Sequence, residues 1–96
     1  MPHKEISVVV PCYREAEVIE RTILSIYTYL KDRFERFEII IVTDGSPDTT
    51  KQNAEKTAAA HPDIPLSIIS FEKNQGKGAA VKAGVFASRY DPILFI

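Results

Sequence analysis

The feature that most restricts the fold is a set of four short apolar runs, at residues 6–10, 37–42, 66–71 and 93–96. They read ISVVV, FEIIIV, LSIISF and ILFI, and they are rich in valine and isoleucine. The first two are nearly continuous instead of alternating between apolar and polar residues. This pattern is typical of strands buried on both faces, as in a parallel sheet that is covered by helices.

The segments between these runs have helical character. In residues 15–33 the apolar side chains recur every three or four positions and form one stripe. Residues 48–60 are polar and rich in alanine, and residues 77–89 carry a stripe of small side chains that would let a helix lie close to a sheet. The order is therefore β-α-β-α-β-α-β, with right-handed crossovers. We predict a three-layer α/β/α, Rossmann-like fold whose parallel sheet has the strand order 3-2-1-4.

Composition and charge exclude several classes of protein. The chain has 96 residues, of which 45% are apolar and 26% charged, and its net charge is −1. This balance offers no electrostatic basis for binding nucleic acid. No apolar run approaches the ~18 residues of a membrane span, and the opening residues MPHKEI lack the apolar stretch of a signal peptide. The only cysteine, Cys12, cannot form an internal disulfide. We therefore expect a cytoplasmic protein with no nucleic-acid partner.

Two polar clusters follow the first two predicted strands. PCYRE occupies residues 11–15, and TDGS occupies residues 43–46. In a doubly wound sheet both clusters reach the same rim, where ligands of such folds bind. By themselves Asp44, Gly45 and Ser46 are a turn and a helix cap. Beside a second polar cluster on the neighbouring strand end, the same residues favour a ligand site.

Three familiar kinds of site do not fit this rim. A dinucleotide-binding turn needs G-x-G-x-x-G after the first strand, where this chain reads PCYREA. The GKG at residues 76–78 is not a P-loop, because Phe71 occupies the place of the first glycine and Gly78 that of the serine or threonine. His3 lies near the terminus and His61 beside a proline in a loop, so neither suggests a catalytic triad.

The side chains that remain suit a nucleotide. Tyr13 offers a flat ring and a hydroxyl group, and Pro11 restrains the backbone where the strand ends. Glu15 and Asp44 offer carboxylates that accept hydrogen bonds from base N–H groups or ribose hydroxyls. Lys77, in a glycine-flanked loop, suits a phosphate group.

Three segments carry a resemblance to a known family. They are VVVPCYREAEVIERTILSI (8–26), FEIIIVTDGSPDTT (37–50) and KNQGKGAAVKAGVFASRYDPILFI (73–96). Together, the P-x-Y-x-E, D-G-S and N-x-G-K-G motifs resemble the amino-terminal half of the family 2 glycosyltransferases, which have the GT-A fold. Within that family the pattern is similar to the polyprenyl- and dolichyl-phosphate hexosyltransferases, and slightly more to the glucosyl branch than to the mannosyl branch.

The resemblance implies roles for particular residues. Pro11, Tyr13 and Glu15 match the first segment that contacts the nucleotide sugar, while Val42 and Asp44 match the strand end that holds the base and ribose. The chain departs from the family at one position of the rim. The family commonly has two aspartates before the glycine, and here Thr43 replaces the first of them.

The resemblance also implies what the rest of the enzyme contains. Residues 1–96 would be the nucleotide-sugar-binding part of a catalytic domain, truncated just before a D-x-D motif that binds Mg²⁺ or Mn²⁺ and the donor diphosphate. The implied reaction transfers a hexose from UDP-glucose or GDP-mannose to polyprenyl or dolichyl phosphate, at the cytoplasmic face of a membrane. Because the metal ligands and the catalytic base would lie beyond Ile96, we expect residues 1–96 to hold no metal and to be inactive by themselves.

A second hypothesis is a non-catalytic α/β domain, either a receiver-like domain or a structural partner domain. A receiver would place acidic residues at the end of the first strand, where this chain has Pro11 and Cys12. The apolar strand at residues 93–96 would form an edge of the sheet. An exposed edge strand can pair with a second copy, so a homodimer is a further expectation.

Overall fold

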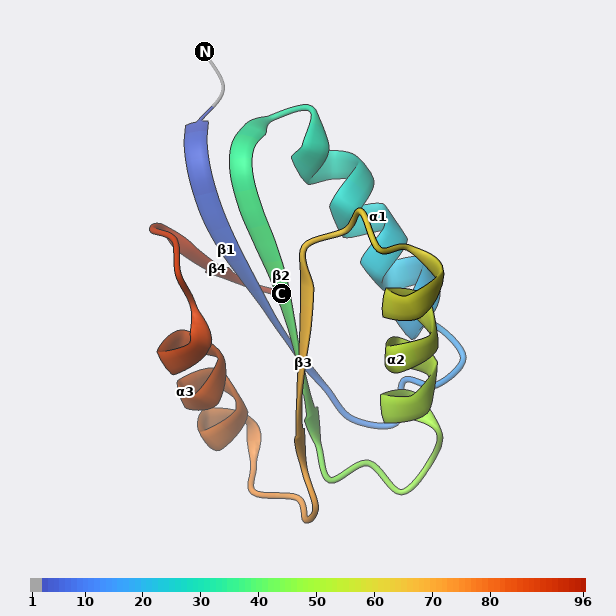
Figure 1. The fold of residues 1–96 in the computed structure, drawn as a ribbon. Coiled ribbons are helices and arrows are strands. Elements are labelled where there is room, and N and C mark those ends of the chain that lie inside the picture. Colours follow the sequence, from blue (N-terminus) through green and yellow to red (C-terminus); the bar gives the residue numbers. More distant parts are fainter. Residues whose placement is uncertain (1–2) are drawn as a thin grey trace.

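The predicted sheet is present, with the predicted strand order. The computed structural model describes residues 3–96. Its strands β1 (His3–Cys12), β2 (Phe34–Asp44), β3 (Leu66–Phe71) and β4 (Ile93–Phe95) form one sheet in the order β3-β2-β1-β4. All three strand pairs are parallel. Figure 1 shows β1 and β2 at the centre of the sheet.

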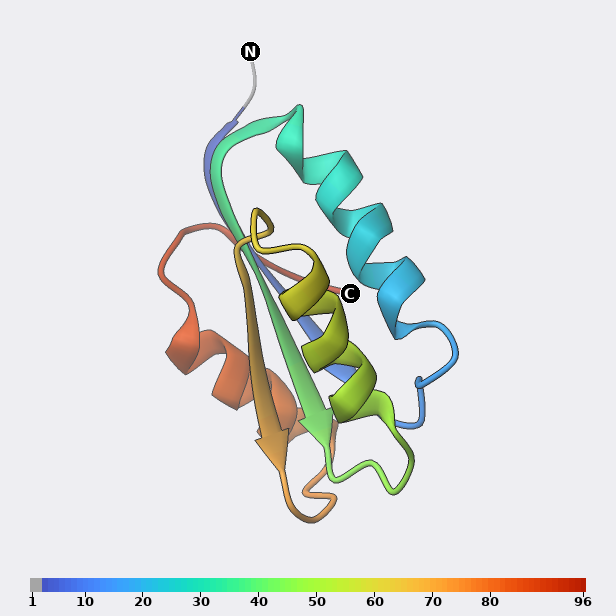
Figure 2. The same cartoon turned by 45° about the vertical axis from the view of Figure 1, so that its right-hand side comes forward.

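Three helices cover the two faces of the sheet. Helices α1 (Ile19–Lys31) and α2 (Thr50–Ala60) lie on one face, and α3 (Lys77–Ala87) lies on the other, as Figures 1 and 2 show. The predicted three-layer arrangement is therefore confirmed. None of the helices in residues 3–96 has the length and apolar character needed to cross a membrane.

The two-sided cover explains why the strand sequences are continuous apolar runs. Against α1 and α2 the sheet buries one set of side chains, which includes Val8, Val10, Ile39 and Ile41. Against α3 it buries the alternate set, Val9, Ile40 and Val42, which pack with Ala80 of the helix. Successive residues of a strand point to opposite faces, so a strand that is covered on both sides needs apolar residues at every position.

The stripe of small residues on α3 has the predicted effect. Gly84 and Ala80 are buried against the sheet. A Cβ atom placed on Gly84 would lie 2.2 Å from Cγ1 of Val9, so any larger residue would push the helix away from β1.

Helix α1 begins later than its apolar pattern predicts. It starts at Ile19 instead of residue 15. Residues 15–18 form a turn in which the Glu15 carbonyl accepts hydrogen bonds from the backbone N–H groups of Val18 (3.0 Å) and Ile19 (2.9 Å). Arg14, just before this turn, has a φ of 55°, which a helix does not allow.

Two of the apolar runs contain a polar residue, and these residues form a buried polar cluster towards the amino end of the sheet. Ser7 and Glu38 are opposite each other in the β1–β2 register, and both are buried. Glu38 Oε2 accepts hydrogen bonds from Ser7 Oγ (2.6 Å) and from the backbone N–H of Arg89 (2.6 Å). Ser7 Oγ in turn accepts from the backbone N–H of Tyr90 (3.0 Å). The cluster therefore ties the segment that leads from α3 into β4 to the centre of the sheet.

Candidate functional site

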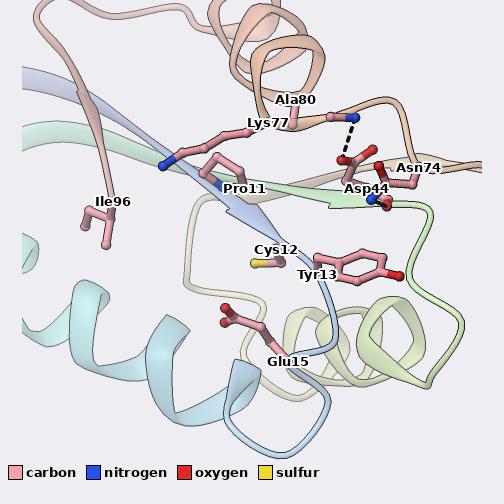
Figure 3. A pocket seen from close by; sticks show the side chains of 10 residues that line it. Pro11, Cys12, Tyr13, Glu15, Asp44, Asn74, Lys77, Ala80 and Ile96 are labelled. Atoms are coloured by element: carbon pink, nitrogen blue, oxygen red, sulfur yellow. Dashed lines mark hydrogen bonds between the residues drawn. The ribbon is translucent and has the colours of Figure 1, made fainter.

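A cavity of about 400 Å³ lies at the carboxyl end of β1 and β2, beside the start of α3. Five of the six residues predicted to bind a ligand line it, namely Pro11, Tyr13, Glu15, Asp44 and Lys77. Figure 3 shows these side chains around one hollow, with Tyr13 and Glu15 across from Lys77. The tertiary fold thus brings together polar residues from three separate stretches of the chain.

Val42, the sixth predicted residue, lies elsewhere. Its side chain is fully buried and packs with Val9, Ile40 and Ala80 between the sheet and α3. It is not among the residues that line the cavity. Its side chain therefore supports the rim by packing and does not face the hollow.

Asp44 does more than turn the chain. Its Oδ1 accepts a hydrogen bond from the backbone N–H of Gln75 (2.7 Å), and its Oδ2 accepts one from the backbone N–H of Gly76 (3.0 Å). The side chain of Asn74 returns a bond to the Asp44 carbonyl (3.2 Å). The aspartate thus fastens the loop before α3 to the end of β2. Because a carboxylate has about four acceptor positions, it retains capacity for a ligand.

Gly45 lets the two motifs pack backbone to backbone. Its φ is 63°, in the left-handed region that favours glycine. A Cβ at this position would lie 2.2 Å from the amide nitrogen of Asn74 and 2.3 Å from the carbonyl carbon of Lys73. The D-G-S and N-x-G-K-G motifs, which are about thirty residues apart in sequence, are therefore two halves of one rim. Asn74, to which the sequence analysis assigned no role, also lines the cavity.

The loop that carries Tyr13 and Glu15 is held by hydroxyl groups of the second motif. The backbone N–H of Arg14 donates to Ser46 Oγ (2.8 Å), and that of Glu15 donates to Thr50 Oγ1 (2.9 Å). These bonds hold the loop against the start of α2. Tyr13 is exposed and lines the cavity, and the guanidinium carbon of Arg14 lies 5.5 Å from the centroid of its ring.

Lys77 is the first residue of α3. In Figure 3 its side chain extends past Pro11, and its ammonium group points away from Asp44. The amino end of a helix attracts anions, and a lysine there adds a full positive charge. The Asp44 carboxylate already accepts from the Gly76 N–H group at this helix end, so the positive charge that remains for a ligand is the Lys77 ammonium group, with Glu15 across the cavity.

Cys12 lines the cavity but is chemically quiet. It is buried, and its thiol lies 3.4 Å from the Val10 carbonyl oxygen. Burial, and then the nearby Glu15 carboxylate, raise the pKa of the Cys12 thiol to about 12. The thiol is therefore protonated at neutral pH and is no nucleophile.

Thr43, the residue that replaces an aspartate of the family pattern, does not line the cavity. It is buried, and its hydroxyl donates to Ser70 Oγ on β3 (2.8 Å).

The carboxylates of the rim do not make a metal site by themselves. Within residues 3–96, no three side chains of the metal-ligating kinds come together. Both oxygens of Asp44 already accept backbone N–H groups, which is the pattern of a structural acceptor. The residues present therefore do not fit a Mg²⁺ or Mn²⁺ ion without further ligands.

The comparisons with known proteins agree with this arrangement. The sequence model of the family named glycosyl transferase family 2 matches residues 7–96, so the chain belongs to that family. This assignment replaces the receiver-like hypothesis.

Among curated proteins, the human dolichyl-phosphate beta-glucosyltransferase is 37% identical over 98 residues, which cover 97% of this chain and 30% of that protein. A dodecaprenyl-phosphate galacturonate synthase from Rhizobium johnstonii is 34% identical, over 88% of this chain and 25% of that protein. The chain thus spans about a third or less of the length of these relatives.

Solved structures show the same fold. The mannosyltransferase PcManGT from Pyrobaculum calidifontis, in complex with GDP-Man and Mn²⁺, matches with a TM-score of 0.83 and 27% identity, over 95% of this chain and 26% of that one. The glucosyl-3-phosphoglycerate synthase from Mycobacterium tuberculosis, with Mn²⁺, UDP and glucosyl-3-phosphoglycerate, matches with a TM-score of 0.74 and 29% identity, over 97% and 33%. The sheet of this chain is that of the GT-A glycosyltransferases, as the resemblance implied.

Proposed function

We propose that the full-length protein is a hexosyltransferase that moves a sugar from a nucleotide sugar to a polyprenyl or dolichyl phosphate, and that the rim cavity holds part of the donor. The observation that carries the proposal is the cavity itself. In a chain of the glycosyl transferase family 2, three separate stretches bring an aromatic ring, two carboxylates and a lysine to one hollow.

Each group in the cavity suits one part of a nucleotide sugar. The partly exposed ring of Tyr13 provides a surface on which a base stacks. The carboxylates of Glu15 and Asp44 accept from base N–H groups or ribose hydroxyls. The ammonium group of Lys77, which points away from Asp44, favours a diphosphate.

For the donor we favour UDP-glucose, with GDP-mannose as the second candidate. The support for glucose is the set of relatives named dolichyl-phosphate beta-glucosyltransferase, from human to yeast. The support for mannose is the similarity to the mannosyltransferase solved with GDP-Man.

We further propose a divalent metal, Mg²⁺ or Mn²⁺, with ligands outside the described residues. We also propose a location at the cytoplasmic face of the membrane that holds the lipid acceptor. The homodimer through the exposed β4 edge stays a prediction.

The test is a transfer assay with the full-length protein, each nucleotide sugar in turn, and a polyprenyl phosphate. We expect transfer from one donor in the presence of Mg²⁺ or Mn²⁺ and its loss on chelation with EDTA. We expect residues 1–96 alone to transfer no sugar, because the proposal places the metal ligands and the catalytic base outside them. Absence of transfer from every donor, or transfer by residues 1–96 alone, would contradict the proposal.

Asp44→Asn tests the donor site directly. An amide has one acceptor oxygen in place of two, so either the Gln75 or the Gly76 N–H group would face an NH₂ group instead of an acceptor. The amide would also lose a charge-assisted hydrogen bond from the nucleotide, which is worth roughly 1–3 kcal/mol. We expect the affinity for UDP or GDP, measured by calorimetry on the full-length protein, to fall roughly ten- to a hundredfold.

Asp63→Asn is the matched control for this change. Asp63 is an exposed carboxylate outside the cavity whose side chain accepts one bond, from the Tyr27 hydroxyl (3.2 Å). The control should bind nucleotide as the wild type does. Equal affinities for the wild type and Asp44→Asn would remove Asp44 from the donor site.

A further inference from the structure

Asp48 lies outside the cavity, yet its carboxylate is the centre of a hydrogen-bond cluster beneath it. Asp48 Oδ1 accepts from Ser46 Oγ (2.6 Å), Thr50 Oγ1 (2.5 Å) and the backbone N–H of Thr50 (3.1 Å). By its position in the sequence this residue belongs only to the turn before α2. Two of the three bonds come instead from hydroxyl groups that have a second partner.

The second partner is the loop that lines the cavity. Ser46 Oγ accepts from the backbone N–H of Arg14, and Thr50 Oγ1 accepts from that of Glu15. A hydroxyl has a single hydrogen, and a carboxylate can only accept. When each hydroxyl donates to Asp48, its lone pairs are left to receive the two amides. The carboxylate therefore fixes the direction of both chains of hydrogen bonds.

The loop needs this support because of its backbone conformation. Arg14 has a φ of 55°, which is unfavourable for a residue with a side chain by about 1–2 kcal/mol. Its two neighbours, Tyr13 and Glu15, both line the cavity. If the backbone at Arg14 relaxed, the side chains of Tyr13 and Glu15 would change direction relative to each other. Hydrogen bonds from Ser46 and Thr50 hold the pKa of Asp48 at about 2, so the carboxylate is ionised at physiological pH.

We propose that Asp48 is a positioning residue for the nucleotide: through Ser46 and Thr50 it holds the 13–15 loop so that Tyr13 and Glu15 face the donor. This inference rests on the proposed function, because it assigns Asp48 a part in donor binding. It also explains why the polar residues after Gly45 lie where they do, next to the cavity but not in it.

The test measures the affinity of the full-length protein for UDP and for GDP, with Mn²⁺ present, by calorimetry. Asp48→Ala should weaken binding roughly tenfold, and Ser46→Ala roughly three- to tenfold, because each leaves a loop amide without an oriented acceptor. Asp48→Asn should restore most of the affinity, since its amide oxygen still accepts from both hydroxyls. The double variant Ser46→Ala/Asp48→Ala should be little weaker than Asp48→Ala, because both changes interrupt one chain of bonds.

A purely structural role at the start of α2 gives a different result. It predicts lower thermal stability for Asp48→Ala, and a smaller loss for Ser46→Ala, whose hydroxyl contacts the Asp48 carboxylate and Thr50 Oγ1, with unchanged nucleotide affinity for both variants. Hydrogen exchange adds an independent measurement: the Arg14 and Glu15 amides should lose protection in Asp48→Ala, and only the Arg14 amide in Ser46→Ala. Thr28→Ala is the control, because it removes a hydroxyl bond of α1 to the Leu24 carbonyl (2.9 Å), away from the cavity.

The outcomes separate the two proposals. If the wild type binds neither nucleotide, the proposed function is wrong and the positioning role fails with it. If the wild type binds and Asp48→Ala binds equally well, only the positioning role is overturned.

Discussion

Gly45→Ala is expected to lower the free energy of unfolding by roughly 3 kcal/mol, which combines the strain of a positive φ with the overlap of two backbones. The added Cβ would lie 2.2 Å from the Asn74 amide nitrogen, an atom that cannot move without displacing the loop before α3. Because that loop also binds the Asp44 carboxylate, we expect nucleotide affinity to fall as well. Urea unfolding and calorimetry measure the two effects.

Alanine substitutions at two other glycines distinguish the cost of backbone strain from the cost of steric overlap. Gly76 has φ 95° and ψ 159°, a conformation open almost only to glycine, but a Cβ there meets no atom within 4 Å, so Gly76→Ala should be unfavourable by about 2 kcal/mol through strain alone. Gly78 lies in α3 with open space around it, and Gly78→Ala should leave stability unchanged or slightly higher. If Gly45→Ala destabilised the protein no more than Gly76→Ala, the close approach of the two motifs would not be rigid.

Glu38→Ala should destabilise the protein by about 3 kcal/mol, because it leaves buried donors without an acceptor. Glu38 is 3% exposed, and its carboxylate accepts from both the Ser7 hydroxyl and the Arg89 N–H group. Glu38→Gln keeps one oxygen and the volume of the side chain, so we expect a smaller loss, of about 1–2 kcal/mol. The measurement is urea unfolding monitored by circular dichroism.

Glu5→Ala is the matched control on the neighbouring strand. Its carboxylate pairs with Arg36 at 3.8 Å on the surface, where such a pair contributes little. The control should change stability by less than about 0.5 kcal/mol. A similarly small change for Glu38→Ala would mean that packing and the remaining hydrogen bonds to Ser7 hold the segment from α3 to β4 without this carboxylate.

Much of the architecture follows from local sequence patterns. The continuous apolar runs at residues 6–10 and 37–42 indicate strands that are buried on two faces. The small residues of 77–89 indicate a helix that packs closely on these strands. The order of the elements and the handedness of their connections restrict the strand order to a few possibilities, and the sheet has the predicted one, 3-2-1-4. This order alone brings Tyr13 and Asp44 to the same rim, since parallel strands end on the same side.

The tertiary structure decided how the polar groups of the rim are used. By its sequence Asp44 is a turn residue and a candidate for nucleotide binding, and nothing local indicates that both of its oxygens accept from the amides of Gln75 and Gly76. In the sequence Gly45 is only a glycine that suits a tight turn, whereas in the structure the backbone of Asn74 lies against it. The physical reason is that periodicity reports which face of an element is buried. A hydrogen bond or a close backbone contact between distant residues depends instead on register and loop path, which exist only once the sheet has formed.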